Sequence, residues 1–497
     1  MHKSKILHQE QGVTPLTISC VNQWGFHEKY GVKYMAPLKF DYSFIEHLAD
    51  TSINWYGDYN NWEALGELTL NKVKQDPNFT DKVLAEEFEV GSKLIKLADE
   101  IAVSDLSTWD KEKVAENLGA LLQLGKDLCG VGLIAVTSDL RHFKLSNTLK
   151  SIINNKLKEF NLGLNINEVF STLITPTQTI YARDLRLDLL RLAKEFSQKK
   201  EMHISDADSK IRAIATKYVW YDFGYLGPSH EVKYYVQEIE DILSFVDDID
   251  KRLSETETEL EILAEKQKEL EKKLVFSQEE ANLFKAARDF MYNKQYRTET
   301  EFKLFYVVDL LLERACELVS VRKIDLHYCV ISEVLQIIRG EMDIKELPIA
   351  GRKKHCICIE EPGKGFYIIS GSQADKYIRH NVEAEEYDVD VTTIHGMVAY
   401  PGEVEGEVKI VKGAKDIDKL KTGDILVAVQ TTPDVLPAMK KAAGFVTDIG
   451  GITCHAAIVA REMKKPCIVG TKIASKVFKD GDRIKVDGNN GDVLKLA

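Results

Sequence analysis

A short run near the end of the sequence combines residue types that suit phosphoryl chemistry. His455 follows two adjacent glycines, Gly450 and Gly451, and the hydroxyl residue Thr453. A neutral imidazole is a nucleophile near pH 7 and can hold a phosphoryl group covalently. Glycines let the backbone approach a phosphate closely, since no side chain intervenes. This spacing therefore indicates a histidine that carries a phosphoryl group.

The flanking residues predict the elements that position His455. An apolar, strand-like stretch leads into residues 447–448, and Thr453 stands where the N-cap of a short helix is expected. Pro466 prevents that helix from continuing. His455 then lies in the first helical turn, where unpaired backbone N–H groups and the positive end of the macrodipole favour phosphate and a neutral ring. The residues expected to contact the phosphoryl oxygens are Gly450, Gly451, Thr453 and Cys454.

The run GGITCHAAIVARE resembles the phosphohistidine signature of the phosphoenolpyruvate-utilising enzymes, which include phosphoenolpyruvate synthase and rifampicin phosphotransferase. The resemblance extends through residues 431–448 and 482–496 and covers about the last hundred residues, the size of one small domain. It implies that Thr432 and Asp434 belong to the same motif, with Asp434 either a loop cap or a ligand contact. Arg461 either faces a docking partner or forms a surface ion pair.

Length and composition bound the rest of the chain. The 497 residues, 44% of them hydrophobic, predict two to four domains with real cores. A formal net charge of −12 argues against a general nucleic-acid binder. No apolar run approaches the roughly 18 residues of a membrane span, and the first residues lack the apolar stretch of a secretory signal. We expect a cytoplasmic protein that binds neither nucleic acid nor membrane.

The eight cysteines are scattered through a long chain without a CxxC pair, and they are interpreted as reduced thiols. Cys356 and Cys358 lie in the sequence HCICIE, which is typical of an alternating strand, with metal binding as the less favoured alternative. No cluster of carboxylates suggests a dedicated magnesium site. The sequence therefore predicts no metal bound by this chain.

The chain before the phosphohistidine region divides into an aromatic-rich segment and a helical one. Residues 1–80 carry many tryptophans and tyrosines, which either fill a small core or line a ligand pocket. Residues 81–340 show helical periodicity. A heptad seam over 246–274, followed by a capping box at Ser277, predicts an antiparallel helical hairpin over 232–297. The seam could instead join two subunits.

Two places in the helical region are candidates for substrate contact. The loop over residues 218–231 contains Trp220 and Asp222, and loops on rigid scaffolds often contact ligands. The stretch over 287–315 loosely resembles the helical substrate domain of rifampicin phosphotransferase-like proteins, with Arg288 and Arg297 in corresponding basic positions. Such residues would meet a phosphorylated nucleotide or substrate, or simply form a solvated helix face.

Strand-like alternation marks residues 341–380, and the acidic stretch 381–391 is interpreted as a linker. Residues 392–497 alternate strands and helices, ending in a hairpin through GNNG. We therefore predict a multidomain fold with a large, mainly α-helical body that contains a long helical hairpin, followed by a C-terminal α/β domain. The resemblance identifies that domain as the swivelling β/β/α phosphohistidine fold.

Several relatives in this family carry an ATP-grasp domain that charges the histidine, and this sequence shows neither such a domain nor a C-terminal barrel. The order of its parts resembles rifampicin phosphotransferase without its ATP-grasp part, or the split phenylphosphate synthase. The resemblance implies a phosphotransferase subunit that binds no cofactor alone. ATP and Mg²⁺ would arrive with a separate ATP-grasp partner, and His455 would pass the phosphoryl group to a small-molecule acceptor bound by the helical domain.

Two other functions stay open at the level of sequence. The phosphohistidine domain could act as a phosphorylation-dependent switch in a binding or regulatory protein. The chain could also be a degenerate relative that keeps the site without charging it. A pocket in the helical body within reach of His455 would favour the phosphotransferase over both.

Overall fold

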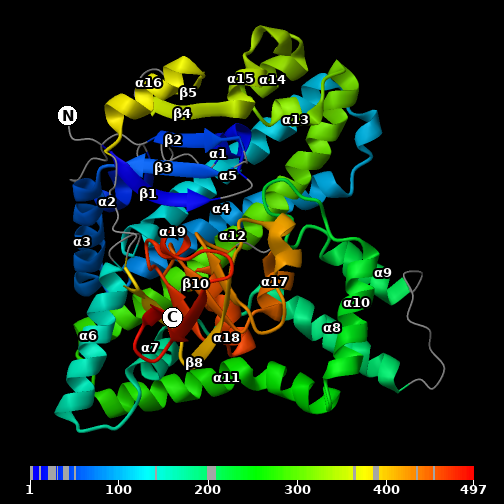
Figure 1. Ribbon diagram of the computed structural model, residues 1–497. Helices are drawn as coiled ribbons and strands as arrows, with labels where there is room; N and C mark the ends of the chain where they lie inside the picture. Colours follow the sequence, from blue (N-terminus) through cyan, green and yellow to red (C-terminus); the bar gives the residue numbers. More distant parts are fainter. Residues whose placement is uncertain are drawn as a thin grey trace.

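The computed structural model of the chain describes residues 4–10, 13–20, 29–30, 32–36, 44–49, 52–139, 143–198, 209–361, 365–383, 391–431, 435–451 and 454–496. Figure 1 shows a small sheet at one end of a large helical body, with the C-terminal domain lying between that sheet and the long helix α11 (Ile249–Leu274). The strands of the C-terminal domain form a second, separate sheet.

The small sheet has five antiparallel strands in the order β1-β3-β2-β4-β5. Three strands come from the N-terminal segment and two from the region after residue 341, which the sequence analysis had divided into separate units. The structure thus merges these units, because Phe44 to Leu48 pair with the strand that begins at His355. The strands are β1 (Lys5–Glu10), β2 (Phe44–Leu48), β3 (Ile53–Gly57), β4 (His355–Glu361) and β5 (Gly365–Ser370).

The aromatic residues of the N-terminal segment fill cores beside this sheet. Phe44 stacks on Tyr56 with ring centroids 4.9 Å apart, and Trp55 meets Trp62 edge to face at 5.1 Å. All four side chains are buried, so they stabilise the fold rather than line an open pocket. Cys356 and Cys358 are likewise buried in β4, and the described residues contain no group of three or more potential metal ligands.

The helical body is built around α4, α5 and α12, which pack against one another along much of their length. Leucines and other apolar residues on their facing sides form the core that also takes in α14. The helices of the body are α1 (Pro15–Cys20), α2 (Val32–Met35), α3 (Tyr59–Gln75), α4 (Phe79–Ala102), α5 (Lys111–Thr137), α6 (Lys144–Glu159), α7 (Ile166–Ile174), α12 (Gln278–Val319), α13 (Lys323–Leu326) and α14 (Ile331–Arg339). Short helices α15 (Ile349–Lys354) and α16 (Ser372–Asn381) flank the small sheet.

Helix α5 is long and apolar enough to cross a membrane by length and composition. Its most apolar window is 61% buried within the protein, and the helix lies at the centre of the body against α4 and α12. This placement is that of a core helix.

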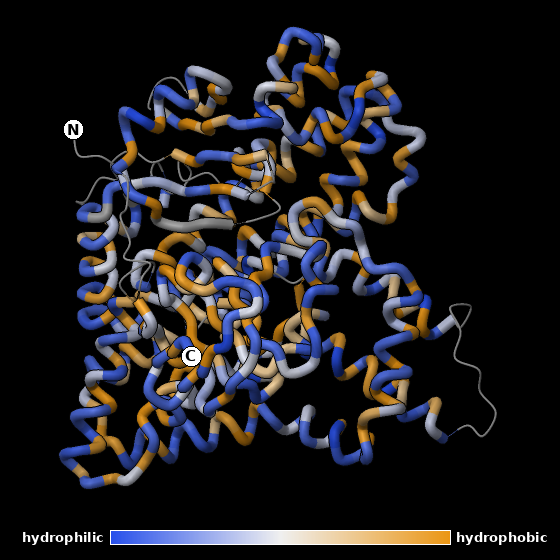
Figure 2. The backbone as a smooth tube through the Cα atoms, viewed as in Figure 1, coloured by the Kyte–Doolittle hydropathy of each residue, from blue (hydrophilic) through white to orange (hydrophobic). Residues whose placement is uncertain are grey.

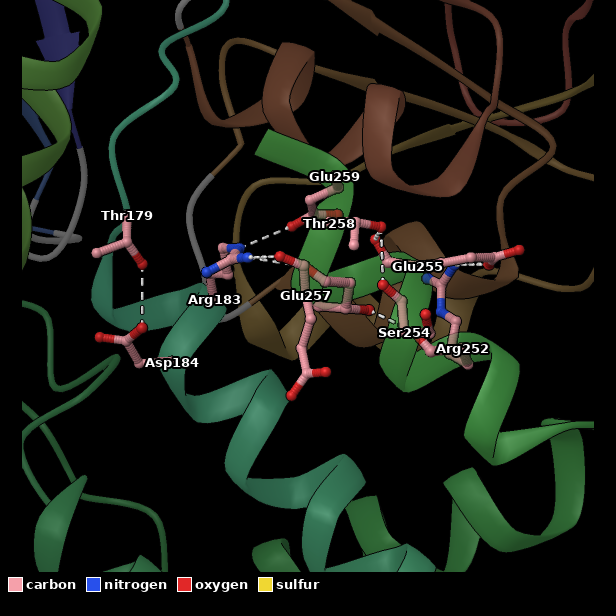
Figure 3. A network of polar contacts seen from close by, with 10 residues as sticks. Thr179, Arg183, Asp184, Arg252, Ser254, Glu255, Glu257, Thr258 and Glu259 are labelled. Carbon is pink, nitrogen blue, oxygen red and sulfur yellow. Dashed lines mark hydrogen bonds and ion pairs between the residues drawn. The ribbon is translucent and has the colours of Figure 1, made fainter. Parts of the chain in front are cut away.

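A lateral group of helices consists of α8 (Tyr181–Ser197), α9 (Ser209–Lys217), α10 (Val232–Phe245) and α11. Hydrophobic and hydrophilic stretches alternate along α11 at the lower edge of the molecule (Figure 2). Figure 3 shows how α8 holds α11: the Arg183 guanidinium donates to the Glu259 carboxylate at 3.1 Å and to the Thr256 carbonyl at 2.8 Å. The seam that the sequence predicted is therefore used within the chain.

The partner of that seam differs from the prediction. Helix α11 packs on α7 and α8, whereas α12 leaves the turn at Ser277 and runs up through the body (Figure 1). The predicted antiparallel hairpin over 232–297 is thus wrong beyond its turn, where the capping box and a stack of Phe276 on Phe284 keep the two helices together. The physical reason is that α12 buries apolar residues on several sides and packs against α4 and α5.

The C-terminal domain has eight strands in the order β6-β13-β12-β8-β9-β10-β11-β7. Strands β8 to β11 pair in parallel, and the GNNG hairpin joins β12 to β13 as predicted. Helices α17 and α18 cover one face and α19 the other. The elements are β6 (Thr393–His395), β7 (Met397–Tyr400), β8 (Glu403–Ile410), β9 (Ile425–Ala428), α17 (Leu436–Lys441), β10 (Gly444–Thr447), α18 (His455–Met463), β11 (Cys467–Val469), α19 (Ala474–Val477), β12 (Arg483–Asp487) and β13 (Asp492–Lys495).

Candidate functional site

His455 is the first residue of helix α18, directly after strand β10 and its loop. Its ring nitrogen Nδ1 lies 2.9 Å from the hydroxyl oxygen of Thr431, a buried residue at the end of the loop after β9. This hydrogen bond fixes the orientation of the imidazole. Thr431 was not among the predicted site residues; its neighbour Thr432 was predicted as a supporting residue of the same motif and lies outside the described residues.

The helix begins one residue away from the predicted position. Cys454 is the N-cap, in extended conformation and without a side-chain capping hydrogen bond, whereas the sequence predicted Thr453, which lies outside the described residues. His455 nevertheless lies in the first turn, and the helix ends at Met463, before Pro466, as predicted. Its first-turn N–H groups point toward the preceding loop, where an anion is favoured.

The loop before His455 needs glycine for two reasons. Gly450 has a φ of +114°, which other residues rarely adopt, and a side chain there would meet the Cys454 sulfur at 2.7 Å. Gly470, in the neighbouring loop, has a φ of +71° and packs against the Gly450 carbonyl. A side chain at Gly470 would lie 3.0 Å from that carbonyl oxygen. The backbone N–H of Thr471 donates to the Thr447 carbonyl at 3.0 Å and ties the two loops together. These contacts fix the backbone of the glycine loop before His455.

The pKa of the Cys454 thiol depends on the charges around this loop. Burial raises its pKa, while the backbone N–H groups of Ala457 and Ala456 and the positive charges of Lys294 and Arg461 act in the opposite direction. Lys294 belongs to helix α12 of the body. A cation from the body therefore lies near the N-terminus of α18, where it would favour a phosphoryl group.

The glycine loop rests directly on the helical body. A side chain at Gly451 would meet the Phe143 ring at 3.2 Å, and one at Gly470 would meet the same ring at 3.0 Å. Phe143 precedes helix α6 in left-handed conformation, with a φ of +49°. The aromatic ring is thus seated between the two glycine loops of the C-terminal domain.

Asp139, just after helix α5, lies beside this contact, 4.0 Å from where a side chain at Gly451 would begin. Its carboxylate accepts hydrogen bonds from the backbone N–H and hydroxyl of Ser146, at 3.0 and 2.5 Å. Burial raises the pKa of Asp139 to about 6, and burial lowers the pKa of Lys150, its neighbour, to about 8. The body thus places the half-buried Asp139 beside the glycine loop, and no sequence pattern pointed to it.

The remaining predicted residues of this domain are placed only in part. Thr432, Asp434 and Thr453 lie outside the described residues. The Arg461 guanidinium folds back along α18, where Nε donates to the Ala457 carbonyl at 2.9 Å.

The two predicted arginines of α12 occupy different positions. Arg288 donates to the Leu173 carbonyl at 2.8 Å and to Glu271 at 3.1 Å, which ties α12 to α7 and α11. Arg297 instead lies deep between α12 and α5, where its Nε is 3.2 Å from Glu301. Only Arg297 therefore belongs to the interior of the body beneath the C-terminal domain.

The loop over 218–231 packs largely inward. Trp220 is buried and meets Tyr181 edge to face at 4.8 Å, while the Asp222 carboxylate lies 3.8 Å from His230. A shallow hollow of about 430 Å³ lies on α9 and α10 and includes His230, but neither Trp220 nor Asp222 lines it.

Comparison with known proteins agrees with this geometry. Residues 420–491 match the family described as "PEP-utilising enzyme, mobile domain". A probable phosphoenolpyruvate synthase of Archaeoglobus fulgidus is 47% identical over 139 residues, which are 27% of this chain and 18% of that protein. The probable phosphoenolpyruvate synthase of Methanothermobacter thermautotrophicus is 52% identical over 102 residues, which are 20% of this chain and 15% of that protein. The phosphoenolpyruvate synthase of Pyrococcus furiosus is 51% identical over 113 residues, which are 23% of this chain and 14% of that protein. The matches thus span less than a fifth of each relative.

Proposed function

We propose that the chain is a phosphotransferase subunit in which His455 carries the phosphoryl group, because residues 420–491 match the mobile domain of the phosphoenolpyruvate-utilising enzymes. The observation that carries this proposal is the position of His455 at the N-terminus of α18, beside the glycine loop and with Nδ1 engaged by Thr431. Since Nδ1 is engaged, we assign the phosphoryl group to Nε2. The first-turn N–H groups and the loop of Gly450 and Gly451 bind its oxygens.

In the charging step, a separate ATP-grasp partner with Mg²⁺ presents ATP to His455. By analogy with the family, Nε2 attacks the β-phosphorus, water takes the γ-phosphoryl group as phosphate, and AMP is released. The positive end of α18 keeps the imidazole neutral and therefore nucleophilic before this step.

In the transfer step, the hydroxyl oxygen of a small-molecule acceptor attacks the phosphorus. The P–N bond breaks as the P–O bond forms, and the hydroxyl proton ends on the imidazole. In this proposal the helical body holds the acceptor. The contact of Phe143 with the glycine loop and the charge of Lys294 near Cys454 support this placement. The body therefore supplies both position and positive charge at the place of transfer.

The test uses ATP labelled at either the β- or the γ-phosphate, with and without the candidate partner. Acid-labile label should come from the β-position only, depend on the partner, and vanish in His455→Ala. His395→Ala is the matched control, since His395 is a largely exposed histidine of the same domain that is paired with Asp492 at 2.5 Å. Equal labelling of the two variants would refute the role of His455, and label from the γ-phosphate would refute the proposed donor chemistry.

A further inference from the structure

The ring of Phe143, which belongs to the helical body, lies between two loops of the C-terminal domain. A side chain at Gly451 would begin 3.2 Å from the ring atom Cε1, and one at Gly470 would begin 3.0 Å from the ring atom Cζ. Because each glycine meets a different edge of the ring, the ring is held from both sides. Gly451 lies in the loop that leads into His455, where we place the phosphoryl group. The body thus reaches the candidate site through this aromatic side chain.

The missing side chain at Gly451 is explained by this ring and not by the backbone. Gly451 is not among the glycines with a positive φ, so alanine could adopt its backbone conformation. The atoms nearest to a side chain there belong to Phe143 and, at 4.0 Å, to Asp139. A contact of 3.2 Å is tighter than most contacts of real Cβ atoms, so the ring would have to move. The ring therefore occupies the space in front of Gly451.

Both sides of this contact are fixed by hydrogen bonds. In the C-terminal domain, the Lys472 N–H donates to the Asp448 carbonyl at 2.8 Å and joins the two glycine loops. In the body, the Leu145 N–H donates to the Ser138 carbonyl at 3.1 Å and closes the turn that carries Phe143. The φ of Phe143, +49°, is costly for a residue with a side chain and persists only where the surroundings hold it. Such strain beside a candidate site points to a function for the residue.

Water and the acceptor compete for the phosphoryl group of a phosphohistidine. When water reacts, its oxygen attacks the phosphorus, the P–N bond breaks as the P–O bond forms, phosphate leaves, and a proton of the water ends on the imidazole. A closed site prevents this hydrolysis, because it expels water from the reactive group. The contact of the Phe143 ring with Gly451 leaves no room for water between the ring and the loop before His455.

We propose that Phe143 decides which oxygen receives the phosphoryl group. Its ring keeps water away from the phosphohistidine while the C-terminal domain lies on the body, so that the hydroxyl of the acceptor reacts instead of water. Phe143 is thus a specificity-determining residue and takes no part in the bond changes themselves. This inference rests on the proposed function, since it concerns the phosphoryl group that His455 carries.

A ring that only fastens the C-terminal domain to the body predicts a different result. Its loss would act by releasing the domain, so a second link between domain and body would restore the protection. Glu238 of α10 and Lys440 of α17, which pair at 3.3 Å, offer the place for such a link. The Lys440 carbonyl accepts from Lys465 at 2.6 Å, just beyond the end of α18 that is opposite His455. A crosslink there holds the domain without touching the glycine loops.

The experiment phosphorylates the full chain with phosphoramidate, from which ammonia leaves as the phosphoryl group passes to the imidazole, so that neither ATP nor a partner is needed. Tandem mass spectrometry follows the fraction of chains phosphorylated on His455 at pH 7.5. We expect the half-life of the phosphohistidine to be shorter by about fivefold or more in Phe143→Ala. The same loss should appear when a short bifunctional maleimide joins Glu238→Cys to Lys440→Cys. Phe143→Met, with an apolar side chain of similar length, should restore most of the protection.

Two further variants make the result specific to this contact. Phe160→Ala is the matched control: Phe160 follows the same helix α6 and is 38% exposed, and its loss should leave the half-life within twofold of the wild-type value. Gly451→Ala should shorten the half-life in the wild type, because its side chain displaces the ring. In Phe143→Ala, which has no ring to displace, Gly451→Ala should have little additional effect.

An unchanged half-life in Phe143→Ala would overturn the proposal, and so would a shortened one that the crosslink restores, since the ring would then only fasten the domain. Failure of phosphoramidate to label His455 in both the wild type and Phe143→Ala would overturn it too, because another group would then cover the imidazole. Circular dichroism verifies that each variant folds. A chain whose phosphohistidine is protected by Phe143, but which no ATP-grasp partner charges, would refute the proposed function alone.

Discussion

Thr431 and His455, which meet in the C-terminal domain, are 24 residues apart in the chain, whereas Glu87 and Asn293, which meet in the helical body, are 206 apart. The carrier is thus assembled from neighbouring loops of one small domain, and the interior of the body from helices of different parts of the chain. A run of sequence can reveal the first kind of contact. The second kind exists only once the helices have packed.

The two regions also differ in how they relate to other proteins. The family match falls in residues 420–491, and the synthases of the comparison align with 20 to 27% of this chain. The similarity to known proteins is therefore concentrated in the C-terminal domain that contains His455. The helical body, where we propose that the acceptor binds, lies outside the residues that match the family.

The largest expected effect comes from a substitution in the glycine loop before His455. Gly450→Ala should lower the yield of phosphohistidine at least a hundredfold, because alanine resists a φ of +114° and its side chain would collide with Cys454. Gly481→Ala is the control: Gly481 also has a positive φ, +93°, but has open space around it. Quantitative acid-labile labelling compares them, and an equal loss in both variants would show that strain, rather than the site, is responsible.

The next prediction tests whether the C-terminal domain seals the face of the body. The pKa of Asp139, raised to about 6, means that the folded protein holds a proton between pH 4 and 6 that the unfolded chain releases. Wild-type stability should therefore fall as pH rises through this window and level off above it. Asp139→Asn should be more stable than wild type by about 2 kcal/mol at pH 7.5, part of the gain from two pKa units being lost with the Ser146 bonds, and this advantage should shrink at pH 4.5.

Urea unfolding at the two pH values measures this difference. Asp247→Asn, at an exposed position, is the control and should show no pH-dependent advantage. If Asp139→Asn behaves like that control, the Asp139 carboxyl is open to water and the C-terminal domain does not cover it.

A third prediction concerns the orientation of the imidazole. Thr431→Val keeps the shape of the side chain but removes the hydroxyl, and it should slow the phosphorylation of His455 about tenfold, the value of one hydrogen bond of about 1.4 kcal/mol. Thr431→Ser should restore most of the rate. Single-turnover labelling measures both, and an unaltered rate in Thr431→Val would remove Thr431 from the site.

The smallest effect concerns the contact between the two regions. Glu238 of α10 and Lys440 of α17 form an ion pair at 3.3 Å between the two regions, so the double variant Glu238→Cys and Lys440→Cys should be joined by a short bifunctional maleimide crosslinker. Adding Phe143→Ala should lower the crosslinking rate about threefold, since the ring loses its seat between the glycine loops. An unchanged rate would mean that Phe143 does not hold the domain in place.

How much the sequence could predict follows the same division. His455, its helix and the glycine loop were foreseeable, because strand, glycines, helix and Pro466 follow one another within a few residues. The contact of Thr431 with the ring was not predicted, because a sequence shows two adjacent hydroxyl residues but not which of them lies near the imidazole. The start of the helix was placed one residue early, because serine and threonine are the usual N-caps and Cys454 is not.

In the body, periodicity predicted helices but not their partners. The seam of α11 was correctly read as apolar, yet it packs on α7 and α8 because α12 is buried by α4 and α5. The strands near His355 were expected, but not their pairing with the strand at Phe44, which depends on contacts across the whole chain. Arg297 was singled out as basic, whereas its buried partners on α5 could not be read from sequence.

The role of His455 as the phosphoryl carrier is tested most directly by locating the phosphoryl group on the protein. The full chain is incubated with ATP, Mg²⁺ and the ATP-grasp partner, digested at alkaline pH, where phosphohistidine survives, and analysed by tandem mass spectrometry. We predict one phosphoryl group per chain, on His455, that disappears when an acceptor is added. Phosphorylation of another residue, or an unmodified His455 beside a partner that charges a related carrier, would contradict it.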